Sequence, residues 1–226
     1  MQQFERIFIM KSENGRSMVE MLGVLAIIGV LSVGAIAGYS KAMMKYKLNK
    51  HSEAVNMLIN NVLSLYERLP HIQNGNSTSY GKLLYKMGML PDGIVCSQTE
   101  CTDNELKDIF KNRIYIAYDN SPWTDSDGTT KYSNSGYIKF SFNSASVQDV
   151  DICRNIIFTA KENSANIYLL RAGKIAGDNT SVTLYGDSYC SNTNPCLKNL
   201  NLNKSEELCG NCKNNICYVT IIFRSY

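Results

Sequence analysis

The sequence predicts an α+β protein, in which a long N-terminal helix packs on an antiparallel β-sheet head stapled by disulfides. The first half of this helix is predicted to be transmembrane and the second half amphipathic. Three observations carry this prediction. Residues 21–40 are uncharged and mostly apolar, apolar residues then recur at helical spacing as far as Leu69, and alternating apolar residues mark strands beyond Pro70. In addition, all eight cysteines lie from Cys96 onward.

The composition excludes several classes of protein. Of the 226 residues, 44% are hydrophobic and 19% are charged, which excludes a disordered charged tail and a collagen-like repeat. One apolar segment excludes a polytopic transporter. The net charge of +3 is too mild to predict a nucleic-acid partner. With two histidines, no phosphate loop and no Gly-x-Ser-x-Gly elbow, the sequence predicts no enzyme, no catalytic residues and no cofactor.

The segment 21–40 has the length of a membrane span. Twenty residues of helix cover about 30 Å, which is the thickness of the hydrocarbon core. Gly34 and Gly38 have the small-residue spacing that lets helices approach closely in lipid. Basic residues lie on both sides of the segment, so the positive-inside rule leaves its orientation open.

Apolar residues continue beyond the membrane segment at spacings of three and four, which predicts a seam along one helix face. The seam consists of Met44, Leu48, His51, Val55, Leu58, Val62, Leu65 and Leu69. Glycine and proline are missing between Gly38 and Pro70, so one helix is predicted from about residue 18 to 68, roughly 75 Å long. His51 is predicted to be a packed side chain rather than a ligand.

The residues before and inside this helix resemble the processing site of a type IV prepilin. Gly15 is followed by Arg16-Ser-Met-Val-Glu20 and then by the apolar segment. The resemblance implies that a prepilin peptidase cleaves after Gly15, that Arg16 becomes the N-methylated N-terminus, and that Glu20 is the assembly glutamate. It divides the chain into a leader (1–15), a long helix (16–69) and a globular head (70–226). Two departures from the family are Arg16, where many members carry an apolar or aromatic residue, and Ala37, where many carry a kinking proline.

The resemblance also implies partners and a location. It implies a structural subunit of a type IV pilus-like surface filament, which self-associates into a helical filament. The other implied partners are the prepilin peptidase, the assembly machinery in the inner membrane, and membrane lipid before assembly. The precursor would cross the inner membrane once with its head outside the cytoplasm. Independently, the carboxylate of Glu20 at the rim of an apolar helix is costly unless it is paired, and the N-terminal ammonium of a neighbouring Arg16 would pair it.

Two alternatives remain open. One is a pseudopilin of a type II secretion system, which would share the same helix. The other is a soluble secreted binding protein. Ala35-Ile-Ala37 matches the small-x-small site of an ordinary secretory signal, so that cleavage after Ala37 would remove the spanning segment.

Beyond Pro70 the pattern predicts one head. Helices are expected over 79–88 and 147–160, and strands over 113–118, 137–142, 167–171, 181–185 and 217–223. On two of these strands, the residues predicted to point inward are Ile138, Phe140, Phe142, Cys217, Val219, Ile221 and Phe223. The turn 125–128 has too few ligands for a calcium loop.

The eight cysteines predict four structural disulfides in an oxidising compartment. Short polar intervals favour Cys96–Cys101 and Cys190–Cys196. For the remaining four we predict Cys153–Cys217, from the inward faces of a helix and a strand, together with Cys209–Cys212. The main competitor pairs Cys153 with Cys209 and Cys212 with Cys217. The spacing of the last three cysteines is also metal-like, but histidine is missing beyond His71, so no metal site is predicted.

Overall fold

The structure is a computed structural model that describes residues 16–68, 77–96, 101, 106–120, 122–124, 130–132, 134–175 and 181–224. The chain divides into two compact units, Met1–Tyr46 and Lys47–Tyr226, which we describe separately. Gly15, Leu69, Pro70 and the turn 125–128 were singled out in the sequence and lie outside the described residues.

Helix α1 (Arg16–Tyr66) passes through both units as one element of 51 residues. The uninterrupted run of good helix formers after Gly38 accounts for its length, because neither a helix breaker nor a turn sequence intervenes. The last turn closes through backbone bonds from Glu67 N to the Leu63 carbonyl (3.1 Å) and from Arg68 N to the Leu65 carbonyl (3.0 Å). The prediction of one long helix over residues 18–68 is therefore confirmed to within two residues at each end.

An eight-stranded antiparallel sheet forms the centre of the head, with the strand order β2-β3-β4-β7-β10-β8-β9 and with β1 also paired to β4. Its strands are β1 (Ser77–Ser79), β2 (Val95–Cys96), β3 (Leu106–Lys107), β4 (Arg113–Asp119), β7 (Ser135–Phe142), β8 (Leu169–Lys174), β9 (Ser181–Tyr185) and β10 (Cys217–Arg224). A separate hairpin pairs β5 (Pro122–Thr124) with β6 (Thr130–Tyr132). The expected antiparallel sheet is confirmed.

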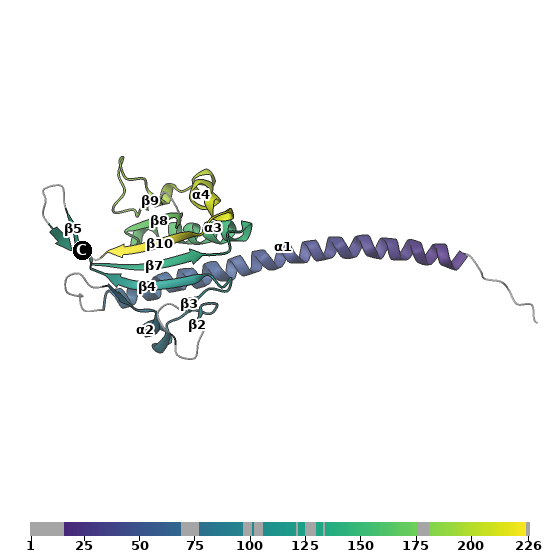
Figure 1. The fold of residues 1–226 in the computed structure, drawn as a ribbon, viewed down its shortest axis with the longest axis horizontal. Coiled ribbons are helices and arrows are strands. Elements are labelled where there is room, and N and C mark those ends of the chain that lie inside the picture. Colours follow the sequence, from purple (N-terminus) through teal and green to yellow (C-terminus); the bar gives the residue numbers. More distant parts are fainter. Residues whose placement is uncertain are drawn as a thin grey trace, which may run out of the picture. The chain divides into compact units, whose positions relative to one another are not determined.

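Alternation along the central strands produces one apolar side of the sheet. On β7, Ile138, Phe140 and Phe142 are fully buried, while the residues between them are partly exposed. On β10, Cys217, Val219, Ile221 and Phe223 are buried, as the sequence predicts. In Figure 1, β4, β7 and β10 run side by side, and the part of α1 within the head lies against one side of them. The buried residues of α1, of α3 (Val147–Glu162) and of the strands form a single core.

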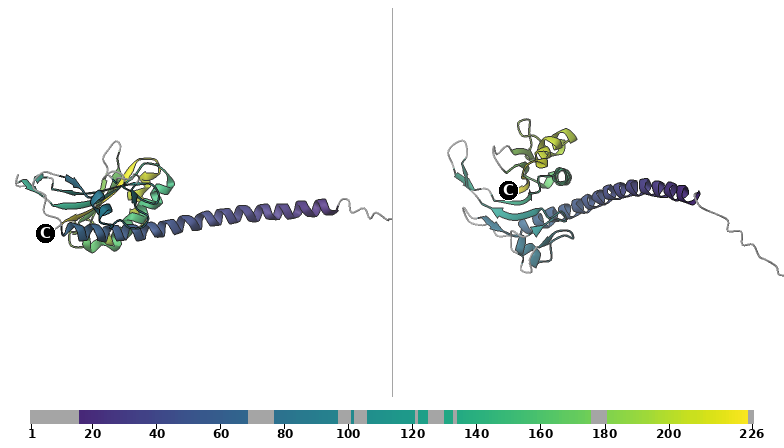
Figure 2. Two further views of the ribbon diagram at one scale, coloured as in Figure 1. Left: turned by 90° about the horizontal axis from the view of Figure 1, so that it is seen from below. Right: turned by 45° about the vertical axis from the view of Figure 1, so that its right-hand side comes forward.

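The remaining helices are short. They are α2 (Gly81–Lys86), α4 (Leu202–Cys209), and the 3-10 turns η1 (Ser164–Asn166), η2 (Leu197–Asn199) and η3 (Gly210–Lys213). Figure 2 shows α3 and the α4 region gathered at one end of the sheet. Ser146 caps α3 by accepting a hydrogen bond from the backbone N–H of Asp149 (3.3 Å), and Asn201 caps α4 through Lys204 N (2.9 Å). The strand predicted over 167–171 begins and ends two to three residues later, as β8.

Candidate assembly surface

The N-terminal part of α1 has an apolar surface that no described residue of its own unit covers. Met18 is 77% exposed, Val30 is 75% exposed, and even the most covered large apolar side chain there, Ile28, is 53% exposed. The exposed large apolar residues of this part are Met18, Val19, Met21, Leu22, Val24, Leu25, Ile27, Ile28, Val30, Leu31, Val33, Ile36 and Tyr39. A surface of this kind marks contact with a membrane or with another protein.

By length and composition, this part of α1 could cross a membrane. Its most apolar window has a mean hydropathy of 2.4, and none of that window is buried. Together with four disulfides, which form and persist in oxidising compartments, this indicates a location outside the cytoplasm for the head. We refer to residues 18–40 of α1 as the apolar half.

Glu20 is the acidic residue of the apolar half. It lies one turn after the start of α1 at Arg16, and it is exposed among exposed apolar neighbours. An ionised carboxylate in such surroundings would be costly in lipid or in a helix bundle unless a cation meets it. Gly15, the predicted cleavage residue, precedes the described residues directly, and α1 begins at Arg16, the predicted new N-terminus.

Four glycines open the surface of the apolar half. A Cβ atom added at Gly23, Gly29, Gly34 or Gly38 would find nothing within 4 Å. Within its own unit, then, the fold does not need glycine at these positions, although each glycine costs a helix interior about 1 kcal/mol relative to alanine. Bare backbone at such positions lets a second helix approach closely. Near Ala37 the helix continues, and the hydroxyl of Ser40 donates to the carbonyl of Ile36 at 2.9 Å.

Within the head, the second half of the seam is covered by the sheet and by α3. Val55, Leu58, Val62 and Leu65 are buried, as their spacing predicts. His51, at the start of this buried stretch, is 1% exposed, which confirms it as a packed side chain. The apolar residues of the seam within the head are thus already buried by the head itself, whereas those of the apolar half remain exposed.

Polar residues from two distant elements surround His51. Its Nε2 lies 3.1 Å from Asp108 Oδ2, and its Nδ1 lies 2.8 Å from Asn155 Oδ1 on α3. One residue further along α1, the hydroxyls of Ser52 and Thr159 are 2.7 Å apart. Sequence reasoning found neither Asp108 nor Asn155, because the helical pattern of α1 carries no signal of partners that lie so far along the chain.

All eight cysteines are paired in the structure. The bridges Cys96–Cys101 and Cys190–Cys196 confirm two of the predicted pairs, with Cα–Cα distances of 5.5 and 4.9 Å. The predicted pairs Cys153–Cys217 and Cys209–Cys212 are wrong. Instead, the competing connectivity is present, Cys153–Cys209 with Cα atoms 5.7 Å apart and Cys212–Cys217 with Cα atoms 5.4 Å apart.

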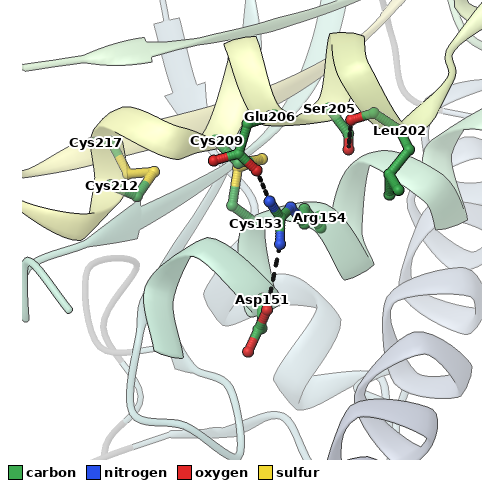
Figure 3. Close-up of a disulfide and its surroundings, with 9 residues drawn as sticks. All are labelled: Asp151, Cys153, Arg154, Leu202, Ser205, Glu206, Cys209, Cys212 and Cys217. Atoms are coloured by element: carbon green, nitrogen blue, oxygen red, sulfur yellow. Dashed lines mark hydrogen bonds and ion pairs between the residues drawn. A yellow bond between two sulfur atoms is a disulfide. The ribbon is translucent and has the colours of Figure 1, made fainter. Parts of the chain in front are cut away.

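The position of helix α4 explains why the observed pairing differs from the predicted one. Figure 3 shows α4 lying over α3, so that Cys209 at the end of α4 reaches Cys153 directly. The turn η3 then brings Cys212 beside Cys217 at the start of β10. The prediction correctly placed Cys153 and Cys217 in the core, but it lacked α4 and η3, which bring Cys209 to Cys153 and Cys212 to Cys217.

An arginine on α3 reinforces the same junction. Arg154 forms an ion pair with Glu206 on α4, and its Nη1 lies 3.6 Å from Asp151 Oδ1 on its own helix (Figure 3). Together with the Cys153–Cys209 bridge, this contact fixes α4 to α3. Among the described residues, no three His, Cys, Asp or Glu side chains are grouped closely enough to hold a metal ion.

Comparison with known proteins adds no relative, since no family model, no curated protein and no solved structure matches the chain.

Proposed function

We propose that the chain is a structural subunit of a type IV pilus-like surface filament, processed by a prepilin peptidase after Gly15 and assembled through the apolar half of α1. The observation that carries this proposal is the uncovered apolar half with Glu20 near its start, joined by one continuous helix to a folded head. An ordinary single-pass anchor needs an apolar segment, but it needs neither the carboxylate nor the glycines.

Lipid would cover the apolar half before assembly, and other copies of the same helix would cover it afterwards. Moving each large apolar side chain out of water is favourable by about 1.5–3 kcal/mol, so there is a strong driving force to cover these residues. Lipid satisfies them equally well, so the preference for helix partners must come from close packing at the glycines and from charge. In the filament, Glu20 of one subunit would pair with the N-terminal ammonium on Arg16 of the next.

The disulfides of the head fit a protein that must persist outside the cell. The structure holds α4, η3 and the start of β10 to α3 by two bridges and an ion pair. Such cross-links limit local unfolding where no chaperone or reducing system restores the fold. We therefore place the head on the filament surface and the apolar half in its interior.

Replacing Glu20 tests this proposal. In cells that assemble the filament, Glu20→Gln should leave the amount of chain in the membrane unchanged, because it removes a charge from an apolar segment. The amount of sheared surface filament should fall by about tenfold or more, because a desolvated charge pair left with one partner is penalised by several kcal/mol. Glu53→Gln is the matched control, because it removes the same charge from an exposed position of α1 in the head.

The proposal requires the two variants to differ. Equal filament yields from Glu20→Gln and Glu53→Gln would contradict an assembly role for Glu20. If the Glu20→Gln protein were missing from the membrane fraction, the substitution would instead act on membrane insertion.

A further inference from the structure

The side of the sheet that faces away from α1 and α3 carries more cations than anions. Strand register places the following residues on this outer face: Lys107, Arg113, Tyr115, Asp119, Ser135, Tyr137, Lys139, Ser141, Arg171, Thr183, Tyr185, Tyr218, Thr220, Ile222 and Arg224. Five of these are cationic and one, Asp119, is anionic. Arg224 lies over the ring of Tyr168, 5.1 Å from its centroid, and lines a hollow with Tyr66 and Glu67, so four cations remain for this face. Fold alone does not require this segregation.

Two of the cations share one row across the strands. Lys139 pairs in register with Thr220, and Thr220 pairs with Arg171, so the two cations share one row two strands apart. Two strand spacings correspond to about 10 Å. Arg171 and Arg113 are exposed, while Lys139 is partly covered. An extended anionic chain lying across the sheet would therefore meet cations at intervals.

A shallow hollow of about 310 Å³ lies between Lys139 and Arg171. The hydroxyl-bearing residues Ser135, Tyr137, Tyr218 and Thr220 line it together with Ile222. Asp119 is also a lining residue of this hollow. Hydroxyl donors and acceptors, two cations and one carboxylate form a mixed hydrogen-bonding site that suits a ligand rich in both hydroxyl and acidic groups.

The tyrosines of the outer face are poor platforms for nucleic-acid bases. The ammonium of Lys139 lies over the ring of Tyr218, 5.1 Å from its centroid, and therefore occupies one ring face. Tyr115 and Tyr137 pack against each other with centroids 5.9 Å apart and ring planes at 46°. Base stacking needs an open ring face. In addition, a carboxylate such as that of Asp119 accepts hydrogen bonds from free sugar hydroxyls, which the backbone of a DNA strand lacks.

We propose that the outer face binds an anionic polysaccharide, with Lys139 and Arg171 holding its acidic groups and the hollow between them holding a sugar ring. The assignment rests on the head alone and does not depend on filament assembly.

Binding to a carboxylate-bearing glycan tests the assignment. The full chain in neutral detergent is titrated against fluorescein-labelled oligogalacturonate, with labelled oligothymidylate of equal charge and neutral dextran as comparisons, at about 50 mM salt to limit screening. We expect saturable binding of oligogalacturonate that is tighter than that of oligothymidylate, and no binding of dextran. Tighter binding of oligothymidylate, or no saturable binding of oligogalacturonate, would overturn the proposal.

Two charge-matched double variants locate the site. Lys139→Gln with Arg171→Gln should weaken oligogalacturonate binding about tenfold, since each exposed ion pair contributes modestly. Lys198→Gln with Lys213→Gln removes two exposed cations from η2 and η3 and should leave binding unchanged. Equal losses in both would show attraction by net charge alone and overturn the proposal. Should the first double variant fail to fold, Lys107→Gln with Arg113→Gln tests the same face and carries the same expectation of weaker binding.

Asp119 separates glycan recognition from general attraction to anions. In the Asp119→Asn variant, the ratio of oligogalacturonate affinity to oligothymidylate affinity should fall, because repulsion of both anions is relieved alike whereas an acceptor for sugar hydroxyls becomes a weaker one. Because both affinities are measured on the same protein, the ratio is insensitive to partial unfolding. An unchanged or increased ratio would contradict the glycan assignment. A chain that self-associates but does not bind glycan would instead assign the face to a second copy, if Lys139→Gln with Arg171→Gln abolished the self-association.

Discussion

His51 on α1 and Asp108 after β3 form a fully buried pair, with His51 Nε2 3.1 Å from Asp108 Oδ2, although the two residues are 57 positions apart in the sequence. Asp108 Oδ1 also accepts hydrogen bonds from the backbone N–H groups of Phe110 and Asn112, both at 2.8 Å. The rings of Phe110 and Phe140 contact the imidazole edge-on, with centroids 5.4 and 6.5 Å away. This pair therefore ties α1 to the loop before β4 and to the centre of the core.

Removing one member of this pair should destabilise the head strongly. Asp108→Ala leaves His51 and two backbone N–H groups buried without their acceptor, and we expect the free energy of unfolding to fall by about 3–5 kcal/mol. Urea unfolding of the full chain in neutral detergent, followed by near-ultraviolet circular dichroism, measures the change.

The exposed pair of Lys50 and Glu53 is the control for this effect. Their charged atoms are 2.7 Å apart and both side chains are more than half exposed, so Glu53→Gln should change the free energy of unfolding by about 0.5 kcal/mol or less. A comparable change in both variants would contradict a special contribution of the buried pair to stability.

The disulfides should differ in their contribution according to the loop that each closes. In the chain-entropy account, Cys153–Cys209 closes 56 residues and should contribute about 4 kcal/mol, whereas Cys96–Cys101 closes 5 residues and should contribute about 2 kcal/mol. Paired substitutions by alanine, compared by urea unfolding, measure both values. Non-reducing peptide mapping should recover Cys153 joined to Cys209, and a peptide joining Cys153 to Cys217 would contradict the connectivity.

Asp149 on the first turn of α3 predicts a pH dependence of stability. Burial raises its pKa above the ordinary value of 3.8, although backbone N–H groups of residues 144–146 act to lower it. As pH rises from about 3.8 through the raised value, the unfolded chain loses its proton first, so the free energy of unfolding falls.

The Asp149→Asn variant removes this titration. As pH rises from acidic to neutral, the wild type should therefore lose stability relative to this variant. Urea unfolding of both proteins at several pH values in this range measures the difference. A wild type that gains stability over Asp149→Asn as pH rises would show that the carboxylate is stabilised in the fold.

Regular patterns in the sequence predicted the long elements well. The seam of α1 and the alternation of Ile138, Phe140 and Phe142 each repeat often enough to identify helix and strand, and the boundaries of β9 match the prediction. The short helix α4 was missed because it offers little periodicity: only Ser205, Leu208 and Cys209 are buried, and Leu202 is 69% exposed. Its capping residue Asn201 was the available signal.

The apolar half and the outer face also differ in how far the sequence predicts them. The apolar half and Glu20 could be recognised because all their residues are contiguous in the sequence. The outer face could not, because Arg113, Lys139 and Arg171 come from three strands and become neighbours only through strand register. The mild net charge of the chain conceals this local surplus of cations.

The N-terminus of the mature chain tests the central claim most directly. Intact-mass analysis and N-terminal sequencing of protein isolated from its native cell surface should find Arg16 as the first residue, with residues 1–15 removed and α1 complete. A chain that begins at Gly38 would contradict assembly through the apolar half, because it would lack Glu20 and most of that surface. A chain that still begins at Met1 would show a plain membrane anchor instead.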